Sequence, residues 1–201
     1  MSTARLAAVP RGGRPRSPEA DRAIVDATLE LIAEEGVTGL SVESVAVRAG
    51  VAKTTIYRRW SGKEDLVAEA LATLNDDLEE LPEGSAAGRA TWMLNQMRVR
   101  SSESVAGRIF PKMAGYARTH PELWAAFHAR VLEPRRERLR GILREGMASG
   151  ELRADLDLEL AVNLLVGGMV YTLNMRPPGL VVPDDYAERL VALALAGMGD
   201  R

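Results

Sequence analysis

The sequence has 201 residues, a formal net charge of −2 and no cysteine. This length suffices for one large domain, or for a small domain joined to a larger one, with a buried core. The lack of cysteine excludes disulfides, thiolate metal sites and thiol nucleophiles, and two histidines, His120 and His128, are too few for most histidine clusters. Because aromatic residues are only 4% of the chain, we expect helices rather than sheets.

Neither a targeting segment nor a membrane span is predicted. The apolar residues near the N-terminus end at Pro10, before they reach the length of a signal peptide. The longest uncharged run, residues 160–175, contains two asparagines and two glycines and is shorter than the ~18 residues of a membrane span. We therefore expect a cytoplasmic protein that has no membrane partner.

Residues 1–16 are predicted to form a flexible basic arm. They contain four arginines, two glycines, two prolines and no acidic residue, a composition that cannot build a core. The segment Gly13-Arg14-Pro15-Arg16 resembles the core of AT-hooks, which implies that Arg14 and Arg16 enter the minor groove of A·T-rich DNA. The alternative is a tail that adds only nonspecific positive charge.

A first helix is predicted over residues 18–35. Ser17 suits the N-cap and Pro18 suits the first helical position, because proline has no amide hydrogen to lose there. Apolar residues then recur at helical spacing on one face. Gly36 is expected to end this helix, since glycine adopts the left-handed conformation without strain.

Two short helices are predicted next, over residues 42–49 and 53–60. Ser41 is expected to be the N-cap of the first of them. A capping box formed by Ser61 and Glu64 should then begin a fourth helix, which extends to about residue 80.

The two short helices have the spacing of a helix-turn-helix. Ala46 is small enough for the helices to cross closely, and Gly50 permits the tight turn between them. Val51, Ile56 and Trp60 should point inward. An outward face of hydroxyls and cations, suited to phosphates and base edges, is left: Lys53, Thr54, Thr55, Arg58 and Arg59. The alternative is a solvated face on an ordinary helical hairpin.

A dense pattern of correctly spaced residues extends beyond these helices. It consists of Gly36, Leu40-Ser41-Val42, the whole stretch from Val45 to Trp60, and Lys63-Glu64-Asp65-Leu66. This pattern resembles the N-terminal domain of TetR-type (TetR/AcrR) transcriptional regulators over about residues 18–70. The remainder resembles the C-terminal regulatory domains of that family, in architecture and in short phrases such as Gly150-Glu151-Leu152-Arg153.

The resemblance implies roles for single residues on the outward face. Tyr57 and Lys63 match positions that hold the DNA backbone, and Thr54 and Thr55 match positions near base edges. A bidentate contact to guanine is our expectation for Arg59. The expected DNA contacts are therefore Arg14, Arg16, Ser41, Lys53, Thr54, Thr55, Tyr57, Arg58, Arg59 and Lys63.

Two positions depart from the family pattern. Ala52 replaces the serine that commonly caps the recognition helix, a loss of about 1 kcal/mol unless Thr54 or Thr55 compensates. Glu43 stands where some members carry a cation, and an acid there repels phosphate unless it accepts from cytosine or points away. The operator sequence therefore need not be shared with relatives.

Further helices are predicted near 86–100, 103–118, 121–149, 157–175 and 184–198, with a kink at Pro134. Strand-like alternation is absent from the sequence, so the expected fold is all-α, with an N-terminal three-helix helix-turn-helix domain and a C-terminal helical regulatory and dimerisation domain. The expected domains are residues 1–16 (arm), 17–63 (DNA-binding) and 64–201 (ligand-binding and dimerisation).

The last two helices are apolar nearly all round, which is more than a one-sided surface helix needs. The resemblance implies that they pair two subunits; the alternative is that they are core helices within one subunit. The expected interface residues are Leu158, Ala161, Val162, Leu165, Val166, Met169, Tyr186, Leu190, Leu193 and Ala194.

A ligand pocket in the C-terminal half is implied by the family rather than by any pattern. Eight methionines suggest an adaptable apolar cavity, although for any one of the candidates plain core packing is the simpler interpretation. The candidate lining residues are Trp92, Met93, Met97, Phe110, Met113, Tyr116, Trp124, Phe127, His128, Asn163 and Tyr171.

The sequence therefore predicts a homodimeric, DNA-binding transcriptional regulator, most simply a repressor released from a palindromic operator by a small apolar molecule. Residues 1–63 contain ten Lys/Arg and seven Asp/Glu, a net charge of +3, whereas the rest carries −5. We expect no catalytic residues, cofactor or metal site. The alternatives are a helical scaffold or partner-binding protein, and a small cofactor-free enzyme without DNA binding.

Overall fold

The computed structural model describes residues 18–75, 79–175, 177 and 181–196, and across these ranges the chain is helical with no strand. This confirms the expected all-α fold class. The helices are α1 (Pro18–Gly39), α2 (Val42–Arg48), α3 (Lys53–Tyr57), α4 (Lys63–Ala72), the 3-10 helix η1 (Thr73–Asn75), α5 (Ala86–Glu103), α6 (Val105–Gly115), α7 (Pro121–Phe127), the π-helix η2 (His128–Leu132), α8 (Glu133–Ser149), α9 (Leu158–Met175) and α10 (Tyr186–Ala196).

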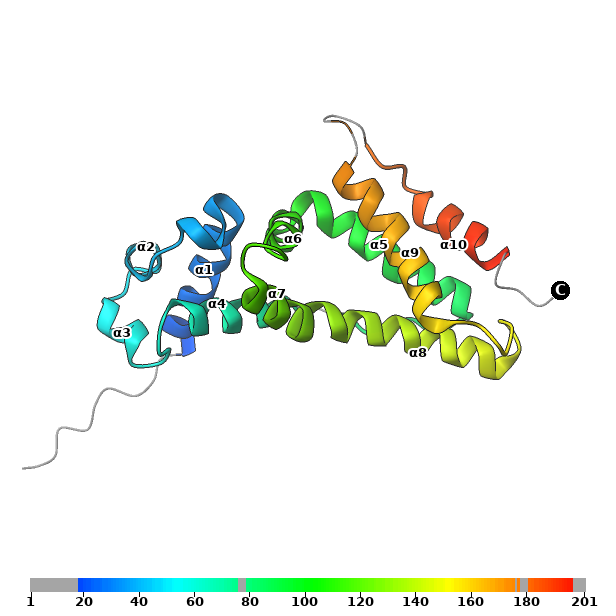
Figure 1. The fold of residues 1–201 in the computed structure, drawn as a ribbon, viewed down its shortest axis with the longest axis horizontal. Coiled ribbons are helices and arrows are strands. Elements are labelled where there is room, and N and C mark those ends of the chain that lie inside the picture. Colours follow the sequence, from blue (N-terminus) through cyan, green and yellow to red (C-terminus); the bar gives the residue numbers. More distant parts are fainter. Residues whose placement is uncertain (1–17, 76–78, 176, 178–180, 197–201) are drawn as a thin grey trace, which may run out of the picture.

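The molecule is elongated, with α1 to α3 at one end and α9 and α10 at the other (Figure 1). Its hydrophobic residues form two separate cores. One core joins α1 to α4 with four buried residues of the later chain: Ile109, Met113, Phe127 and Val131. The second core joins α5, α8, α9 and α10. The packing therefore places α6 and α7 with the N-terminal helices, although they follow α5 in the sequence.

Gly36 breaks the first helix as expected, although α1 resumes and continues to Gly39. Its φ is 76° and its ψ is 173°, outside the helical region. The Tyr116 hydroxyl accepts a hydrogen bond from the Val37 amide at 3.0 Å, and a Cβ on Gly36 would lie 2.5 Å from that oxygen. Glycine is thus required here both for the backbone conformation and for the close approach of α6.

The start of α4 differs from the expectation. Gly62 is the N-cap and provides no side-chain hydrogen bond, so the predicted Ser61–Glu64 capping box is not formed. The Ser61 amide and hydroxyl instead donate to the Asp65 carboxylate, at 3.0 and 3.4 Å. The α-helix ends at Ala72 and continues as η1, which is shorter than the predicted extent to residue 80.

The helix predicted over 121–149 is interrupted by η2, just before Pro134. Proline has no amide hydrogen, so the Arg130 carbonyl four residues earlier cannot receive the usual helical bond from it. Asn75 donates to that carbonyl at 2.7 Å. The Arg135 guanidinium in turn donates to the Asn75 side-chain oxygen at 2.8 Å and to the Leu74 carbonyl at 2.6 Å. We call Leu74, Asn75, Arg130 and Arg135 the Asn75 latch. These four residues connect the end of η1 to η2 and α8.

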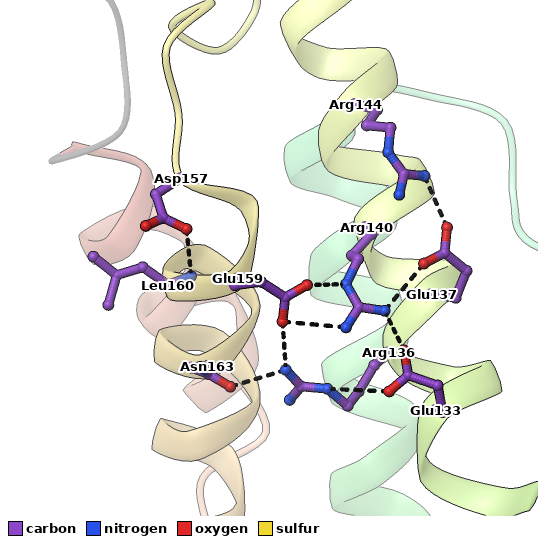
Figure 2. Close-up of polar contacts among 9 residues, drawn as sticks. All are labelled: Glu133, Arg136, Glu137, Arg140, Arg144, Asp157, Glu159, Leu160 and Asn163. Carbon is purple, nitrogen blue, oxygen red and sulfur yellow. Dashed lines mark hydrogen bonds and ion pairs between the residues drawn. The ribbon is translucent and has the colours of Figure 1, made fainter. Parts of the chain in front are cut away.

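A network of charged side chains joins α8 to α9 (Figure 2). The buried Arg140 guanidinium bonds Glu159 of α9, and it also bonds Glu133 at 2.8 Å and Glu137 at 3.0 Å. These carboxylates raise the pKa of Arg140 above its usual range. Arg136 donates to the same Glu159 at 3.1 Å, so one carboxylate of α9 holds two arginines of α8.

The phrase Gly150-Glu151-Leu152-Arg153 joins the end of α8 to the start of α5. Gly150 adopts a left-handed conformation, with φ of 79°, and Leu152 is buried in the second core. The Glu151 carboxylate accepts from the amides of Ala86 and Ala87, at 2.7 and 2.9 Å, and so satisfies two donors at the N-terminus of α5.

Candidate nucleic-acid interface and internal cavity

The helix-turn-helix forms as the spacing predicts. Ser41 caps α2, and a reciprocal pair of bonds with Ser44 makes a capping box. Gly50 has a φ of 66°, and the Val51 amide bonds the Ala46 carbonyl at 3.0 Å, which closes the turn before α3. Because the Ser41 hydroxyl is used in the cap, the structure gives this predicted DNA contact a structural role in α2.

The inward face of the recognition segment follows the prediction, as do three of the five residues predicted on its outward face. Ile56 and Trp60 are buried, and the Trp60 indole donates to Glu69 of α4 at 2.9 Å. Ala52 is the N-cap of α3 and provides no side-chain hydrogen bond, as its position in place of the usual serine predicts. The exposed side chains on the outer face are those of Lys53, Thr54, Tyr57 and Arg58; Thr55 is half-buried beside them.

Two acids of the N-terminal unit hold cations beside this face. Glu43 of α2 is paired with Lys53 at the start of α3, and Glu34 of α1 is paired with Arg48 at 2.7 Å. The hydrogen bond from Lys53 lowers the pKa of Glu43, and the bond from Arg48 lowers the pKa of Glu34. Glu43 is therefore not an unpaired acid beside the outer face of α3, because its carboxylate is partly neutralised by Lys53.

Arg59 does not lie where the sequence predicts. Its guanidinium is ion-paired with Asp21 of α1, and its side chain is only 11% exposed. The Arg59 side chain is thus turned back against the first helix, and its guanidinium is occupied by Asp21 rather than presented on the outward face. Sequence spacing missed this pairing because Asp21 is distant along the chain.

Two further predicted contacts flank the helix-turn-helix. Lys63 is the first residue of α4, and its side chain is half-buried. Arg14 and Arg16 lie outside the described residues, so their expected minor-groove role stays a prediction.

A cavity of about 370 Å³, partly open to solvent, lies where the two cores meet. Its walls come from α5, α6, α7, η2, α8 and α9, so residues far apart in the sequence face one another across it. Its volume falls within the range of small-molecule sites. Seven of the residues predicted to line a pocket line this cavity: Trp92, Met93, Met97, Phe110, Trp124, Phe127 and His128.

Four predicted lining residues lie elsewhere. Met113 is fully buried in the first core, and the Tyr116 hydroxyl accepts from Val37. Asn163 accepts from Arg136 at 3.0 Å in the α8–α9 network, and Tyr171 is exposed on α9. Helical periodicity alone could not separate cavity-facing from core-facing apolar residues, because both face inward.

Four arginines that sequence reasoning missed also line the cavity: Arg100, Arg135, Arg136 and Arg138. Glu79 is the one carboxylate among the described lining residues, and it accepts from Gln96 at 3.0 Å and from Arg100 at 3.3 Å. Burial lowers the pKa of Arg138. The described lining therefore combines an apolar interior with surplus positive charge. Among the same described residues, no group of three or more His, Cys, Asp or Glu could hold a metal ion.

The predicted dimer interface needs correction. Ala161, Val162, Leu165, Met169 and Ala194 are buried in the second core of their own subunit and offer no surface to a partner. The sequence gives too many apolar positions on both helices to tell the two faces apart. Leu158, Val166, Tyr186 and Leu190 are half-buried, and Val166 also lines the cavity; Leu193 alone of the predicted set is fully exposed.

The exposed apolar residues of α9 lie on its opposite face. They recur three or four residues apart, so they share one side of the helix. We call this set, with Leu193 of α10, the α9–α10 surface: Leu160, Leu164, Gly167, Tyr171, Met175 and Leu193. Leu160 is 65% exposed and Tyr171 is 71% exposed. Single exposed apolar side chains are common on protein surfaces, but a continuous row of them is typical of an interaction site.

Comparison with known families agrees with this geometry. Residues 24–70 match the model of the bacterial regulatory proteins of the tetR family, and residues 80–194 match that of the tetracyclin repressor-like C-terminal domain. The chain is 32% identical over 188 residues to the uncharacterized HTH-type transcriptional regulator YdeS of Bacillus subtilis (strain 168), covering 92% of this chain and 93% of that one. It is 28% identical over 184 residues to the HTH-type transcriptional repressor KstR2 of Rhodococcus jostii (strain RHA1), covering 87% and 89%.

Solved structures share the fold. The TetR family transcription regulator SCO0332 superposes with a TM-score of 0.68 at 27% identity, covering 90% of this chain and 100% of that chain. FadR from Bacillus subtilis, solved in complex with stearoyl-CoA, superposes with a TM-score of 0.72 at 23% identity, covering 88% and 98%. The likeness therefore extends over both ends of the molecule.

Proposed function

The chain belongs to the tetR family of bacterial regulatory proteins, and from this premise we propose that it is a homodimeric, ligand-responsive repressor of the cytoplasm. It binds a palindromic operator through two helix-turn-helix units and is released by a small molecule in the cavity. The observation that carries this proposal is the joint presence of an exposed recognition helix and a cavity in one chain. The repressor KstR2 and the stearoyl-CoA complex of FadR are consistent with it.

At the proposed operator contact, Lys53, Thr54, Thr55, Tyr57 and Arg58 face the major groove. The hydroxyls and cations donate to phosphates and base edges, and the methyl groups of the two threonines suit thymine. Lys63 holds a phosphate at the start of α4, where the helix dipole adds to the attraction. In this proposal the DNA-binding unit is residues 17–63, and the basic arm of residues 1–16 adds contacts in the minor groove.

We assign the α9–α10 surface to the dimer. One helix-turn-helix contacts only a few base pairs, so a two-fold pair is needed for a specific site. By length and composition alone α9 is apolar enough to cross a membrane, with 22% of it buried in the subunit. A second copy of the same face covers its exposed residues, and Gly167 lets the helices approach closely.

The Asn75 latch provides a route from the cavity to the DNA-binding unit. Arg135 lines the cavity, and its guanidinium bonds both Leu74 and Asn75 at the end of the helix that begins at Lys63. A ligand that draws Arg135 away weakens these bonds and lets α4 change its position. Such a ligand shifts the population between operator-spaced and other arrangements of the recognition helices.

Selection of operators from genomic fragments by the purified dimer tests the DNA-binding part. Fluorescence anisotropy on the selected fragment then gives the affinity with and without candidate ligands. We expect binding to a palindrome, and ligands that lower this affinity must themselves be bound less tightly when operator is present, by the same factor. Ligand affinity that is indifferent to the operator contradicts the proposed coupling.

The matched test of the route is Asn75→Ala. This change removes the bonds to Arg130 and Arg135 without touching the recognition helix. We expect operator affinity without ligand to stay within about threefold, and the ligand-induced loss of affinity to shrink by about tenfold, since coupling energies of this kind are 1–3 kcal/mol. Gln96→Ala, which removes a cavity residue outside the latch, is the control.

A further inference from the structure

The cavity has two chemically different parts. Its interior is apolar, with Met93 and Met97 of α5, Phe110 of α6, Phe127 of α7 and Val166 of α9. Its α8 side carries three arginines, two of which take part in bonds already described. Arg136 is held by Glu159 and Asn163 in the α8–α9 network, and Arg135 is held by the Asn75 latch.

Arg138 differs from both. Its guanidinium lies over the Trp92 ring, 5.9 Å from the ring centroid, and donates to the main-chain carbonyl of Glu79. Neither contact supplies a negative charge. Burial lowers the pKa of Arg138, which is the direction expected for a cation that has lost water without gaining an equal anionic partner. A guanidinium remains charged under these conditions, because its pKa is far above neutrality.

The surroundings also suit a planar anion. A guanidinium is planar and presents its N–H donors in that plane, where they bond carboxylate or phosphate oxygens in pairs. The contacts of Arg138 with the Trp92 ring and with the Glu79 carbonyl restrict its side chain, which reduces the entropy that is lost when such a bond forms. An anion at this position therefore gains more than it would from a solvated lysine.

We propose that the cavity selects an amphiphilic acid, with an apolar tail between α5, α6, α7 and α9 and a carboxylate or phosphate on Arg138. The inference rests on the proposed function, since it names the class of the effector. It narrows a small apolar molecule to an acidic one. The tail supplies affinity through burial, and Arg138 discriminates against neutral molecules of the same shape.

Calorimetric titration of the full-length dimer with four ligands of equal tail tests this inference: decanoate, decyl phosphate, decanol and decylammonium. We expect an anion to bind about tenfold more tightly than decanol, the value of one charge-assisted hydrogen-bond pair, and decylammonium to bind more weakly still. The two anions distinguish a free acid from a phosphate-bearing source. Decanol that binds as tightly as both anions overturns the proposal.

Substitution assigns the preference to one residue. We expect Arg138→Gln to abolish the preference for anions while decanol affinity stays within about twofold, and Arg138→Lys to retain part of it. Arg144→Gln, on the same helix but outside the cavity lining, is the matched control. Quenching of the fluorescence of Trp92 and Trp124, which both line the cavity, reports occupancy of the site independently of DNA. Anion preference that persists in a folded Arg138→Gln protein overturns the assignment.

Operator binding is measured in parallel, so that the two proposals fail separately. Anions that bind through Arg138 but leave operator affinity unchanged support the ligand class and contradict ligand-responsive repression. Release of the operator by decanol and the anions alike, with equal affinities, supports repression and contradicts the acid class.

Discussion

The helix-turn-helix surface and the α9–α10 surface differ in how many of their interacting groups already have partners within the same subunit. On the first, Glu43, Glu34 and Asp21 each hold a cation next to or within the recognition segment. On the second, large apolar side chains stand exposed without any comparable cover from the subunit. The cations of the DNA-binding end are thus largely neutralised by acids of the same chain, whereas the other end leaves an apolar face exposed, which a second copy covers in the dimer that we propose.

A charge placed on the α9–α10 surface should have the largest effect of all the changes, because it should prevent dimerisation. Leu164 is 51% exposed within the row of exposed residues on α9, so Leu164→Glu leaves the subunit core intact but buries a carboxylate in the proposed dimer. We expect monomers, and a loss of operator affinity of about a hundredfold or more, because burying an unpaired charge costs about 3 kcal/mol. Sedimentation and anisotropy measure the two effects.

The control for this prediction is Ala154→Glu, which adds the same charge at an exposed site before α9. It should leave both the dimer and operator affinity unchanged. A Leu164→Glu protein that remains dimeric with normal DNA binding contradicts the assignment of this surface.

Substitution of Arg59 tests whether ion pairs within the subunit stabilise the DNA-binding end. Arg59→Gln removes a largely buried guanidinium and leaves Asp21, whose side chain is 39% exposed, without its cation, so we expect a loss of about 1 kcal/mol in the free energy of unfolding. The melting temperature should fall by about 2–4 °C. The base preference of the folded variant should not change, as operator selection below its melting temperature measures.

The neighbouring Arg58→Gln is the matched control for stability. Arg58 is exposed, so this variant should lose less than about 0.5 kcal/mol. If Arg59→Gln changes one position of the selected operator and leaves the melting temperature unaltered, Arg59 contacts a base after all.

The contrast between local and distant pairing also explains how much the sequence predicts. The helix-turn-helix, the cap at Ser41 and the break at Gly36 depend on residues within a few positions of one another, and the structure has all three. The partner of Arg59 and the arginines of the cavity depend on helices that meet only after folding. Periodicity identifies apolar residues, but only packing decides whether Leu165 or Leu164 faces the subunit's own core.

Lys63 measures the electrostatic part of operator binding. We expect Lys63→Gln to weaken binding to every sequence by several-fold and to reduce the slope of log affinity against log salt by about one per subunit, because one phosphate contact is lost. Anisotropy titrations over a salt series measure this slope. Arg118→Gln removes an equal charge at an exposed site between α6 and α7 and should leave the slope unchanged.

Glu43→Gln should give the smallest change in operator affinity of the variants considered. It tests directly whether the acids of the DNA-binding end weaken its attraction for DNA. The Glu43 carboxylate competes with DNA phosphates for Lys53, so its removal should raise affinity for every DNA sequence by about two- to fivefold, the size of an exposed ion pair. The gain should decline as salt rises, since both partners are exposed. Glu122→Gln changes the net charge equally at an exposed site of α7 and should give no such gain.

A double-mutant cycle decides whether the effect passes through Lys53. In a Lys53→Gln background the Glu43→Gln change should no longer raise affinity, because the cation that the carboxylate restrains is gone. If the gain persists there, Glu43 acts by general repulsion of the DNA and the pair with Lys53 is incidental. If affinity falls in the single variant, Glu43 itself contacts the operator, as an acceptor from cytosine would, and the loss should then be confined to operators with cytosine at that position.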